Sequence, residues 1–314
     1  MYSTVDSFDV IIVGGSYAGL SAALLLGRSL RSVLVIDGGK PCNRQTPHSH
    51  SYLTRDGETP AQIAAVAKEQ VRHYPTVSFI DDLVITAQAE SAGFLVKTAG
   101  GQQVQSRKLV LATGVYDIMP PISGFAECWG RSVLHCPYCH GYEAHGQRLG
   151  VLANGETAYE MALHIQHWSP TLTLFTNGPS TLTPDQQQDL NQLGIPLVET
   201  TIAAIDHQDG QLTNLRFADG SIQELDALFS RVPFRQHTDL AEQLGCTLAD
   251  SGVISADNFG KTNVAGVFAA GDTSSPLRQV STAVTSGSMA GVMINRELIT
   301  EDLATRLANA EALP

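Results

Sequence analysis

The fold of this chain is decided near its start, by the stretch Val10-Ile11-Ile12-Val13-Gly14-Gly15-Ser16-Tyr17-Ala18-Gly19. Its first four residues are apolar and β-branched, which is typical of a strand buried inside a parallel sheet. A glycine-rich turn follows, and residues 20–30 carry helix formers with an apolar surface. Residues 33–36 are again apolar and end at Asp37, which predicts a second strand. Strand, turn, helix and strand make a βαβ unit, so we expect an α/β fold.

The turn between the first strand and the helix resembles the GxGxxG pattern of dinucleotide-binding proteins, with serine at the middle position. Such a turn lets the backbone approach a pyrophosphate, which the N–H groups at the helix start bind. An acid at the end of the following strand is placed to bond a ribose hydroxyl. An ordinary strand–helix turn is the alternative. The residues predicted here to bind the cofactor are Gly14, Gly15, Ser16, Ala18, Gly19, Asp37 and Gly38.

A second βαβ unit is predicted in the middle of the chain. Residues 149–152 form its strand, residues 153–158 its turn, and its helix runs to about residue 168. Residues 172–175 are the return strand. Prolines at 120 and 121 mark a crossing into this part of the chain, which leaves it again near residues 232–234. The two βαβ units indicate two Rossmann-like, doubly wound domains with three layers each.

The C-terminal region adds a second set of candidate cofactor residues. An apolar strand at 266–270 runs into Gly-Asp and is followed by a long helix from about Ser281. This arrangement suits a flavin ribityl and phosphate site, because the acid accepts hydrogen bonds from sugar hydroxyls and the helix start favours phosphate. A simple strand-end turn is the alternative. The predicted residues, including those that follow the strand at 108–112, are Thr113, Gly114, Gly271, Asp272, Arg278, Gln279 and Val280.

The most informative chemical feature is Cys136-Pro137-Tyr138-Cys139, framed by His135 and His140. Cysteines at this spacing close a small disulfide ring, and a helix start at Cys136 would favour its thiolate. His140 is predicted to give and take the proton during exchange. The alternatives are a zinc site, two buried small residues, and a glutaredoxin-like loop, which is a much shorter module. Cys42, Cys128 and Cys246 are predicted as buried free thiols. His48 and His50 are predicted as loop histidines, with a place in the lining of a flavin pocket as the alternative, since their loop follows Asp37.

Composition limits the classes of function. The 314 residues carry a formal net charge of −12, which argues against a nucleic-acid-binding surface. The sequence has no apolar run of the roughly 20 residues that a membrane helix needs, and an acid stands where a signal peptide has bases. Five cysteines are an odd number and too few for a disulfide framework. We therefore expect a soluble protein of a reducing, cytoplasmic compartment, without membrane or nucleic-acid partners.

Taken together and in this order, these motifs resemble the low-molecular-weight thioredoxin reductases over essentially the whole chain. The segments 135–143 and 42–50 look like the branch that contains gliotoxin-oxidase-like dithiol oxidases and deeply rooted thioredoxin reductase-like flavoproteins. The resemblance implies FAD, a homodimer, and an FAD domain (1–116 and 237–314) split by an NAD(P)-binding-like domain (117–236). It also implies that Cys139 lies nearer the flavin and that Cys136 exchanges with substrate. His140 stands where ordinary members have an aspartate.

The second glycine-rich turn departs from the family pattern. Ala153 replaces its first glycine, while Gly155 and Ala158 are kept. The stretch 175–180 after the return strand holds no Arg or Lys for the 2′-phosphate of NADPH, and no acid for the ribose of NADH. We therefore predict that this domain carries the cysteine pair but uses NADPH poorly.

These observations predict an FAD-dependent disulfide/dithiol oxidoreductase. Its partner would be a thioredoxin-like protein or a small-molecule dithiol or disulfide, and reduced ferredoxin is a candidate electron donor. One alternative is a dithiol oxidase that closes a disulfide in a small molecule and passes electrons to oxygen. The other is a flavin-binding redox sensor without turnover.

Overall fold

Two βαβ units form the centres of two separate units of structure, as the sequence predicts. The computed structural model describes residues 6–311. The first unit contains the described residues up to Arg44, then Ala61–Tyr116, and those from Phe234 onward. The second contains Gln45–Pro60 and Asp117–Pro233.

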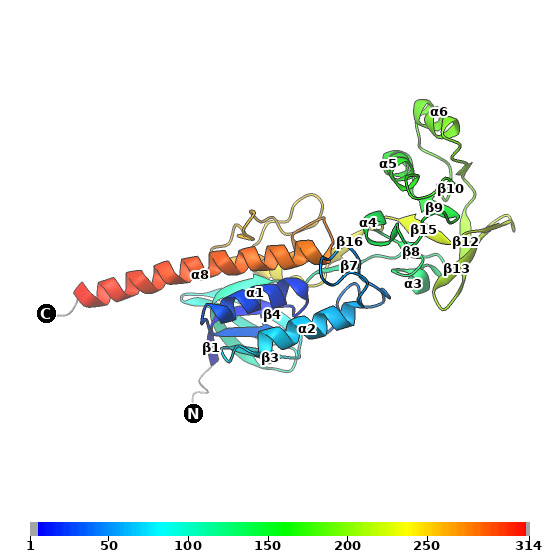
Figure 1. Cartoon of the computed structure of the whole chain (residues 1–314). Helices are drawn as coiled ribbons and strands as arrows, with labels where there is room; N and C mark the ends of the chain where they lie inside the picture. Colours follow the sequence, from blue (N-terminus) through cyan, green and yellow to red (C-terminus); the bar gives the residue numbers. More distant parts are fainter. Residues whose placement is uncertain (1–5, 312–314) are drawn as a thin grey trace. The chain divides into compact units, whose positions relative to one another are not determined.

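The first unit is built on one mixed sheet (Figure 1). Its parallel part has the order β3-β2-β1-β6-β17, and residues 10–13 of β1 are buried because strands flank them on both sides. The long strand β6 also pairs through its first half with an antiparallel hairpin, with Phe94 opposite Ser106. The strands are β1 (Asp6–Val13), β2 (Val33–Ile36), β3 (Val77–Ile80), β4 (Val84–Glu90), β5 (Gly93–Thr98), β6 (Gln103–Leu111) and β17 (Val267–Ala269).

Two helices from opposite ends of the chain, α1 and α8, lie side by side in this unit (Figure 1). They approach closely because α8 has a glycine at the crossing: a Cβ on Gly287 would lie 2.0 Å from the carbonyl oxygen of Ala18. The Ser21 hydroxyl also donates a hydrogen bond of 2.6 Å to the carbonyl of Val284. The helices are α1 (Tyr17–Arg28), α2 (Pro60–Arg72), α7 (Leu240–Gln243), the 3-10 turn η1 (Gly271–Thr273) and α8 (Val280–Glu311).

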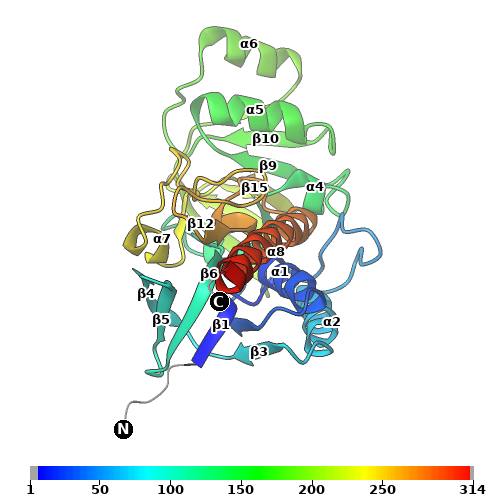
Figure 2. The ribbon, with the colours of Figure 1, turned by 90° about the vertical axis from the view of Figure 1, so that its left-hand side faces the viewer.

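The second unit has a five-stranded parallel sheet of order β11-β10-β9-β15-β8, and α5 lies over β9 and β10 (Figure 2). A separate three-stranded sheet packs its apolar residues, among them Phe217, against Phe175. The strands are β8 (Val133–Leu134), β9 (Leu149–Leu152), β10 (Leu172–Phe175), β11 (Leu197–Val198), β12 (Ile202–Gln208), β13 (Gln211–Phe217), β14 (Ile222–Glu224) and β15 (Ala227–Ser230). The helices are α3 (Phe125–Cys128), α4 (Pro137–His140), α5 (Gly155–Ile165) and α6 (Pro184–Gln192).

Where the chain passes between the two units, strands β7 (Val115–Asp117) and β16 (Phe234–Gln236) pair with each other. The division differs from the predicted 1–116 and 237–314 against 117–236 in one important respect. The loop 45–60 groups with the second unit, although it follows the first βαβ unit in sequence. The physical reason is a set of contacts with the segment around the cysteine pair, such as the hydrogen bond from the Ser51 hydroxyl to the carbonyl of Tyr138.

Candidate functional site

The two cysteines of the CxxC motif lie at the two ends of one helical turn. Cys136 is the N-cap residue of α4, as the sequence predicts, and Cys139 occupies its last turn. The Cys139 thiol donates a hydrogen bond to the Cys136 sulfur, with the two sulfur atoms 2.8 Å apart. This hydrogen bond raises the pKa of Cys139, and burial raises it further. Cys139 therefore keeps its proton, and the sulfur of Cys136 accepts the hydrogen bond from it.

His140 directly follows the pair and is the last residue of α4. Its ring is half-buried, and burial lowers its pKa below the ordinary histidine value. Glu143 counteracts this shift, and His50 adds to it. His140 is consequently neutral near pH 7 and can accept a proton. The alternative of a zinc site is not supported, because among residues 6–311 no three His, Cys, Asp or Glu side chains lie close enough together to hold a metal ion.

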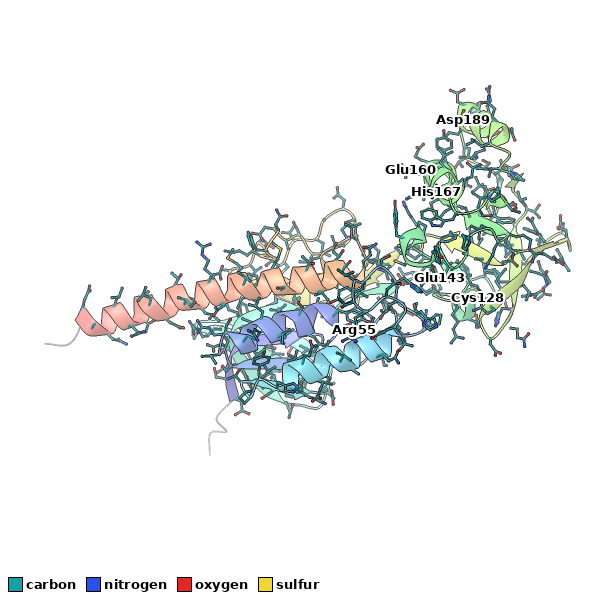
Figure 3. All side chains as sticks on the ribbon, viewed as in Figure 1. Arg55, Cys128, Glu143, Glu160, His167 and Asp189 are labelled. Atoms are coloured by element: carbon teal, nitrogen blue, oxygen red, sulfur yellow. The ribbon has the colours of Figure 1, made fainter. Side chains whose placement is uncertain are left out.

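The loop 45–60 approaches this pair, which the sequence did not indicate. Nε2 of His50 lies 3.4 Å from a carboxylate oxygen of Glu143, and its Nδ1 lies 3.7 Å from Asp56. The rings of His50 and His140 meet edge to face, with centroids 6.5 Å apart. Figure 3 labels Glu143, which follows α4 in the second unit. His50 is thus a half-buried member of the site, whereas His48 is the exposed loop histidine that was predicted.

Aromatic side chains fix α4 against α5. The Tyr138 hydroxyl lies 2.9 Å from Nε2 of His164, and its ring meets Trp168 edge to face at 5.8 Å. Gly141 after the helix permits this packing, because a Cβ there would lie 2.6 Å from the indole nitrogen of Trp168. The segment that carries the cysteines is therefore anchored to α5.

The first glycine-rich turn has the form that a dinucleotide needs. Gly14 has φ +109°, and a Cβ on it would lie 2.2 Å from the carbonyl oxygen of Ala112. A Cβ on Gly19 would lie 1.8 Å from the carbonyl oxygen of Gly14. Ser16 is the N-cap residue of α1 but makes no side-chain cap hydrogen bond. The start of this 12-residue helix is thus suited to receive an anion from outside.

The predicted acids flank this turn at the ends of two strands. Asp37 follows β2, and a Cβ on Gly15 would lie 2.8 Å from the Asp37 side chain. Asp272 lies in η1 after β17, where Arg278 reaches to 3.6 Å of its carboxylate. The other predicted residues are placed as follows: Ala18 and Gly19 in α1, Gly38 after Asp37, Thr113 and Gly114 after β6, Gly271 in η1, Gln279 before α8 and Val280 as its first residue.

The Thr113 hydroxyl lies 3.3 Å from that of Thr273 in η1, which brings the ends of β6 and β17 together.

One of the cysteines is less buried than predicted. Cys42 is half-buried, not buried, because the loop after β2 reaches η1, where its thiol lies 3.5 Å from an Asp272 carboxylate oxygen. Cys128 and Cys246 are buried free thiols as predicted.

The second glycine-rich turn is built differently, because the side chain of its N-cap residue Asn154 bonds the backbone of the turn and of the loop after β10. Oδ1 of Asn154 accepts from the N–H groups of Gly155 and Thr181, at 2.8 and 2.9 Å. Nδ2 of Asn154 donates to the carbonyl of Pro179 at 2.9 Å. The loop after β10 is thereby tied across the start of α5. Nearby, the Ser180 N–H donates to a carboxylate oxygen of Glu199.

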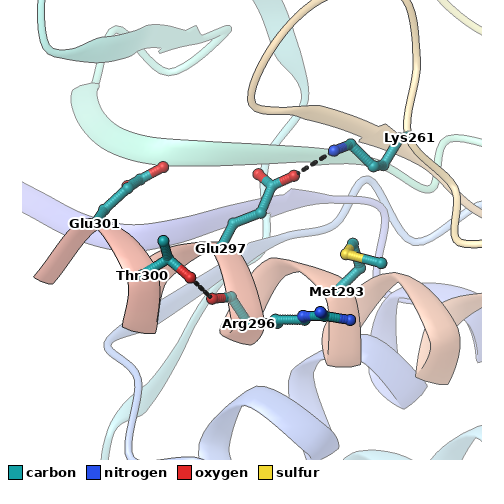
Figure 4. Close-up of a pocket in the computed structure, with 6 residues that line it drawn as sticks. All are labelled: Lys261, Met293, Arg296, Glu297, Thr300 and Glu301. Atoms are coloured by element: carbon teal, nitrogen blue, oxygen red, sulfur yellow. Dashed lines mark hydrogen bonds and ion pairs between the residues drawn. The ribbon is translucent and has the colours of Figure 1, made fainter. Parts of the chain in front are cut away.

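One open hollow of about 260 Å³ lies on α8, away from all the residues predicted to bind a cofactor (Figure 4). Of the charged side chains that line it, Lys261 lies 2.7 Å from Glu297, and Glu301 pairs with Lys108 at 2.6 Å. The hollow contains none of the predicted site residues, so we assign it no part in the chemistry.

Comparison with known proteins agrees with this geometry. The family described as pyridine nucleotide-disulphide oxidoreductase matches residues 8–287. The thioredoxin reductase tcpT of Claviceps purpurea is 36% identical, with 95% of this chain and 97% of that protein covered. Within residues 6–311, none of the helices combines the length and hydropathy that crossing a bilayer requires.

Two solved structures are similar over nearly their whole length. An oxidoreductase from Agrobacterium tumefaciens is 39% identical with a TM-score of 0.88, and the match covers 94% of this chain and 99% of that one. HlmI is 34% identical with a TM-score of 0.91, and the match covers 98% and 97%. The chain therefore belongs to the pyridine nucleotide-disulphide oxidoreductase family, and within it to the thioredoxin reductase-like flavoproteins that act on sulfur groups.

Proposed function

We propose that this chain is an FAD-dependent dithiol/disulfide oxidoreductase in which Cys136 and Cys139 exchange two electrons with an external dithiol or disulfide. The observation that carries the proposal is the thiol–sulfur hydrogen bond of this pair, next to the half-buried His140. FAD, when bound, supplies a two-electron acceptor and donor for the pair. The residues that would hold it are Gly14, Gly15, Ser16, Ala18, Gly19, Asp37 and Gly38, with Thr113, Gly114, Gly271, Asp272, Arg278, Gln279 and Val280.

The exchange with a dithiol begins with the pair oxidised, that is, with Cys136 and Cys139 joined by a disulfide bond. One substrate thiol loses its proton to neutral His140 and attacks the sulfur of Cys136. The Cys136–Cys139 bond breaks, its electron pair leaves on Cys139, and Cys139 takes up the proton because its pKa is raised. The second substrate thiol then loses its proton to solvent and attacks the first substrate sulfur, which releases Cys136 as thiolate. The products are a substrate disulfide and a reduced cysteine pair.

The FAD assignment predicts that Gly14→Ala loses the cofactor. The added Cβ would meet the Ala112 carbonyl oxygen at 2.2 Å, so the turn must shift. Overpacking of this kind costs about 1–3 kcal/mol, which weakens binding roughly ten- to a hundredfold. The measurement is the flavin absorbance per protein, and the affinity of apoprotein for added FAD. Gly101→Ala is the matched control, since φ is +88° there and no atom lies within 4 Å. Full FAD content in Gly14→Ala would contradict the assignment.

The acid–base assignment predicts that His140→Gln slows dithiol-driven flavin reduction by about 10²–10⁴-fold. The pKa of His140 is lowered, so the native rate should fall only as the pH drops below the ordinary histidine range. In the variant, this fall of the rate at low pH (the acid limb of the pH profile) should be absent. Anaerobic stopped-flow mixing with dithiothreitol across pH measures both effects, and His145→Gln is the control on the same exposed segment. An unchanged rate and pH profile would make His140 a structural residue.

The partner is proposed from the same chemistry. A thioredoxin-like protein and a small dithiol both fit the exchange, and the name of the relative tcpT, a thioredoxin reductase, favours the former. The closed second turn favours a donor other than a nicotinamide, such as the dithiol substrate itself or reduced ferredoxin. If dithiols are the donor and oxygen the acceptor, the chain is a dithiol oxidase. Anaerobic flavin reduction by NADPH, NADH, dithiols and reduced ferredoxin, compared side by side, separates these cases. We also expect a homodimer of a cytoplasmic compartment.

A further inference from the structure

We propose that His50 is a positioning residue for the exchange reaction: it sets the protonation of His140 by competing with it for the carboxylate of Glu143. This inference rests on the proposed function only in that His140 is the acid–base group. It assigns a part in the chemistry to the loop 45–60, which follows the first βαβ unit in sequence but packs in the second unit.

The loop 45–60 is held in a defined shape by its own backbone. The Ser49 N–H donates to the carbonyl of Glu58 at 2.8 Å, and the Gly57 N–H donates back to the carbonyl of Ser49 at 2.9 Å. Ser51 has φ +61°, a left-handed conformation that is uncommon for serine. The Ser51 N–H donates a hydrogen bond of 2.7 Å to the Asp56 carboxylate, which holds this carboxylate close to the backbone next to His50.

The same loop is attached to the helix that carries the cysteines. The Ser51 hydroxyl donates to the carbonyl of Tyr138, between the two cysteines in sequence, at 2.9 Å. A Cβ on Gly130 would lie 3.1 Å from the Thr46 hydroxyl, so the start of the loop also contacts the second unit closely. His50 is thus brought to α4 by contacts on both sides of it in the chain.

His50 lies between two carboxylates and keeps only 20% of its side chain exposed. Nε2 faces Glu143 at 3.4 Å, and Nδ1 faces Asp56 at 3.7 Å. A protonated His50 pairs with both acids, whereas a neutral His50 leaves the charge of Glu143 to act on other groups. One imidazole on which this charge acts is that of His140, whose ring centroid lies 6.5 Å from that of His50.

The groups packed around His140 come from three segments. Its own segment contributes Glu143, which raises the pKa of His140, together with Cys136 and Cys139 of α4. The loop contributes His50, whose positive charge lowers this pKa, and Asp56 behind it. Helix α5 carries His164, which is engaged with the hydroxyl of Tyr138, two residues before His140. His50 and Glu143 therefore act on His140 in opposite directions.

The test is a histidine titration of the FAD-loaded protein, followed by NMR on ¹³C-labelled imidazole rings. The signal of His140 is assigned by its absence in His140→Gln. His50→Gln should raise the pKa of His140 by about 0.5 pH unit or more, since it removes a charge at this separation. Glu143→Gln should lower it. His48→Gln should leave it unchanged, because His48 is exposed and its Nδ1 is engaged with the carbonyl of Gly57.

Opposite shifts in His50→Gln and Glu143→Gln, with no shift in His48→Gln, are the expected result, and the acid limb of dithiothreitol-driven flavin reduction should move with them. An unmoved His140 signal in His50→Gln, with flavin content and thermal unfolding as in the native protein, would overturn the proposal. So would shifts of the same sign in both variants. If the NMR shifts appear while His140→Gln reduces flavin at the native rate, the coupling stands and the proposed role of His140 fails.

Discussion

Replacing Cys139 by serine will stop electron transfer between dithiols and the flavin. Serine cannot form a disulfide, so the two-electron step at the pair has no product. Loss of a group that forms the covalent intermediate costs at least about 10³-fold in rate. The measurement is anaerobic bleaching of the flavin by dithiothreitol. Cys246→Ala is the control, because that thiol is buried in the first unit and donates a hydrogen bond to the Thr262 hydroxyl, with the sulfur and oxygen 3.8 Å apart.

The two cysteines should differ in what they trap. In Cys139→Ser, the remaining Cys136 can attack a small disulfide such as cystamine, but no neighbouring thiol resolves the product. A stable mixed disulfide on Cys136 should therefore appear by mass spectrometry. In Cys136→Ser, the raised pKa and burial of Cys139 should make the same adduct form slowly. Full dithiol turnover in both serine variants, or an adduct that forms faster on Cys139, would contradict the assigned roles.

The elements that could be predicted are those specified by neighbouring residues. The strand at 10–13 and the second βαβ unit follow from local patterns of apolar residues and glycine, and the structure has both elements. The two glycine-rich turns are shorter than predicted, because α1 begins at Tyr17 and α5 at Gly155. The predicted position of Cys136 at a helix start is confirmed, and the structure has Pro137 at the first helical position, where proline is favoured. Such signals depend on the backbone preferences of a few adjacent residues.

The parts that could not be predicted depend on contacts between distant segments. Nothing in the sequence around His50 indicates that it meets Glu143, 93 positions later, because loop conformation and tertiary packing decide that contact. Cys42 was misassigned for the same reason, since its exposure depends on where η1 lies. The loop 45–60 is polar and carries two histidines and two serines, a composition that fits a functional loop. Its partners, however, appear only when the fold is known.

The last expected result concerns nicotinamide nucleotides, which should reduce this flavoprotein poorly. A dinucleotide turn offers the N–H groups of a helix start to a pyrophosphate. In the second unit the side-chain oxygen of Asn154 accepts hydrogen bonds from the Gly155 N–H and from the Thr181 hydroxyl. This hydroxyl also lies 2.9 Å from the place that a Cβ on Gly155 would take. In the first unit, by contrast, Ser16 makes no such cap. Both turns follow a glycine-rich pattern, but a side-chain cap hydrogen bond is present at the start of α5 and absent at the start of α1.

Charge adds to this steric argument. Residues 149–215, which include the whole second βαβ unit, contain no lysine or arginine, and the carboxylate of Glu199 sits at the loop where a 2′-phosphate would be recognised. A charged contact is worth about 1.5–3 kcal/mol, so its absence alone weakens binding roughly ten- to a hundredfold. Anaerobic stopped-flow mixing with NADPH and NADH measures the result, and bleaching by dithionite in the same preparation shows that the flavin can be reduced.

The paired change Asn154→Gly with Thr181→Gly separates the two causes. If the tied loop were the only obstacle, this variant would gain rapid reduction by NADPH. We expect a gain of less than about tenfold, because the missing cation is not restored. Flavin bleaching within seconds at submillimolar NADPH in the unaltered protein would overturn the prediction and would mean that the nucleotide binds elsewhere. A slow reaction in both proteins, together with rapid reduction by dithiols, places the entry of electrons at Cys136 and Cys139.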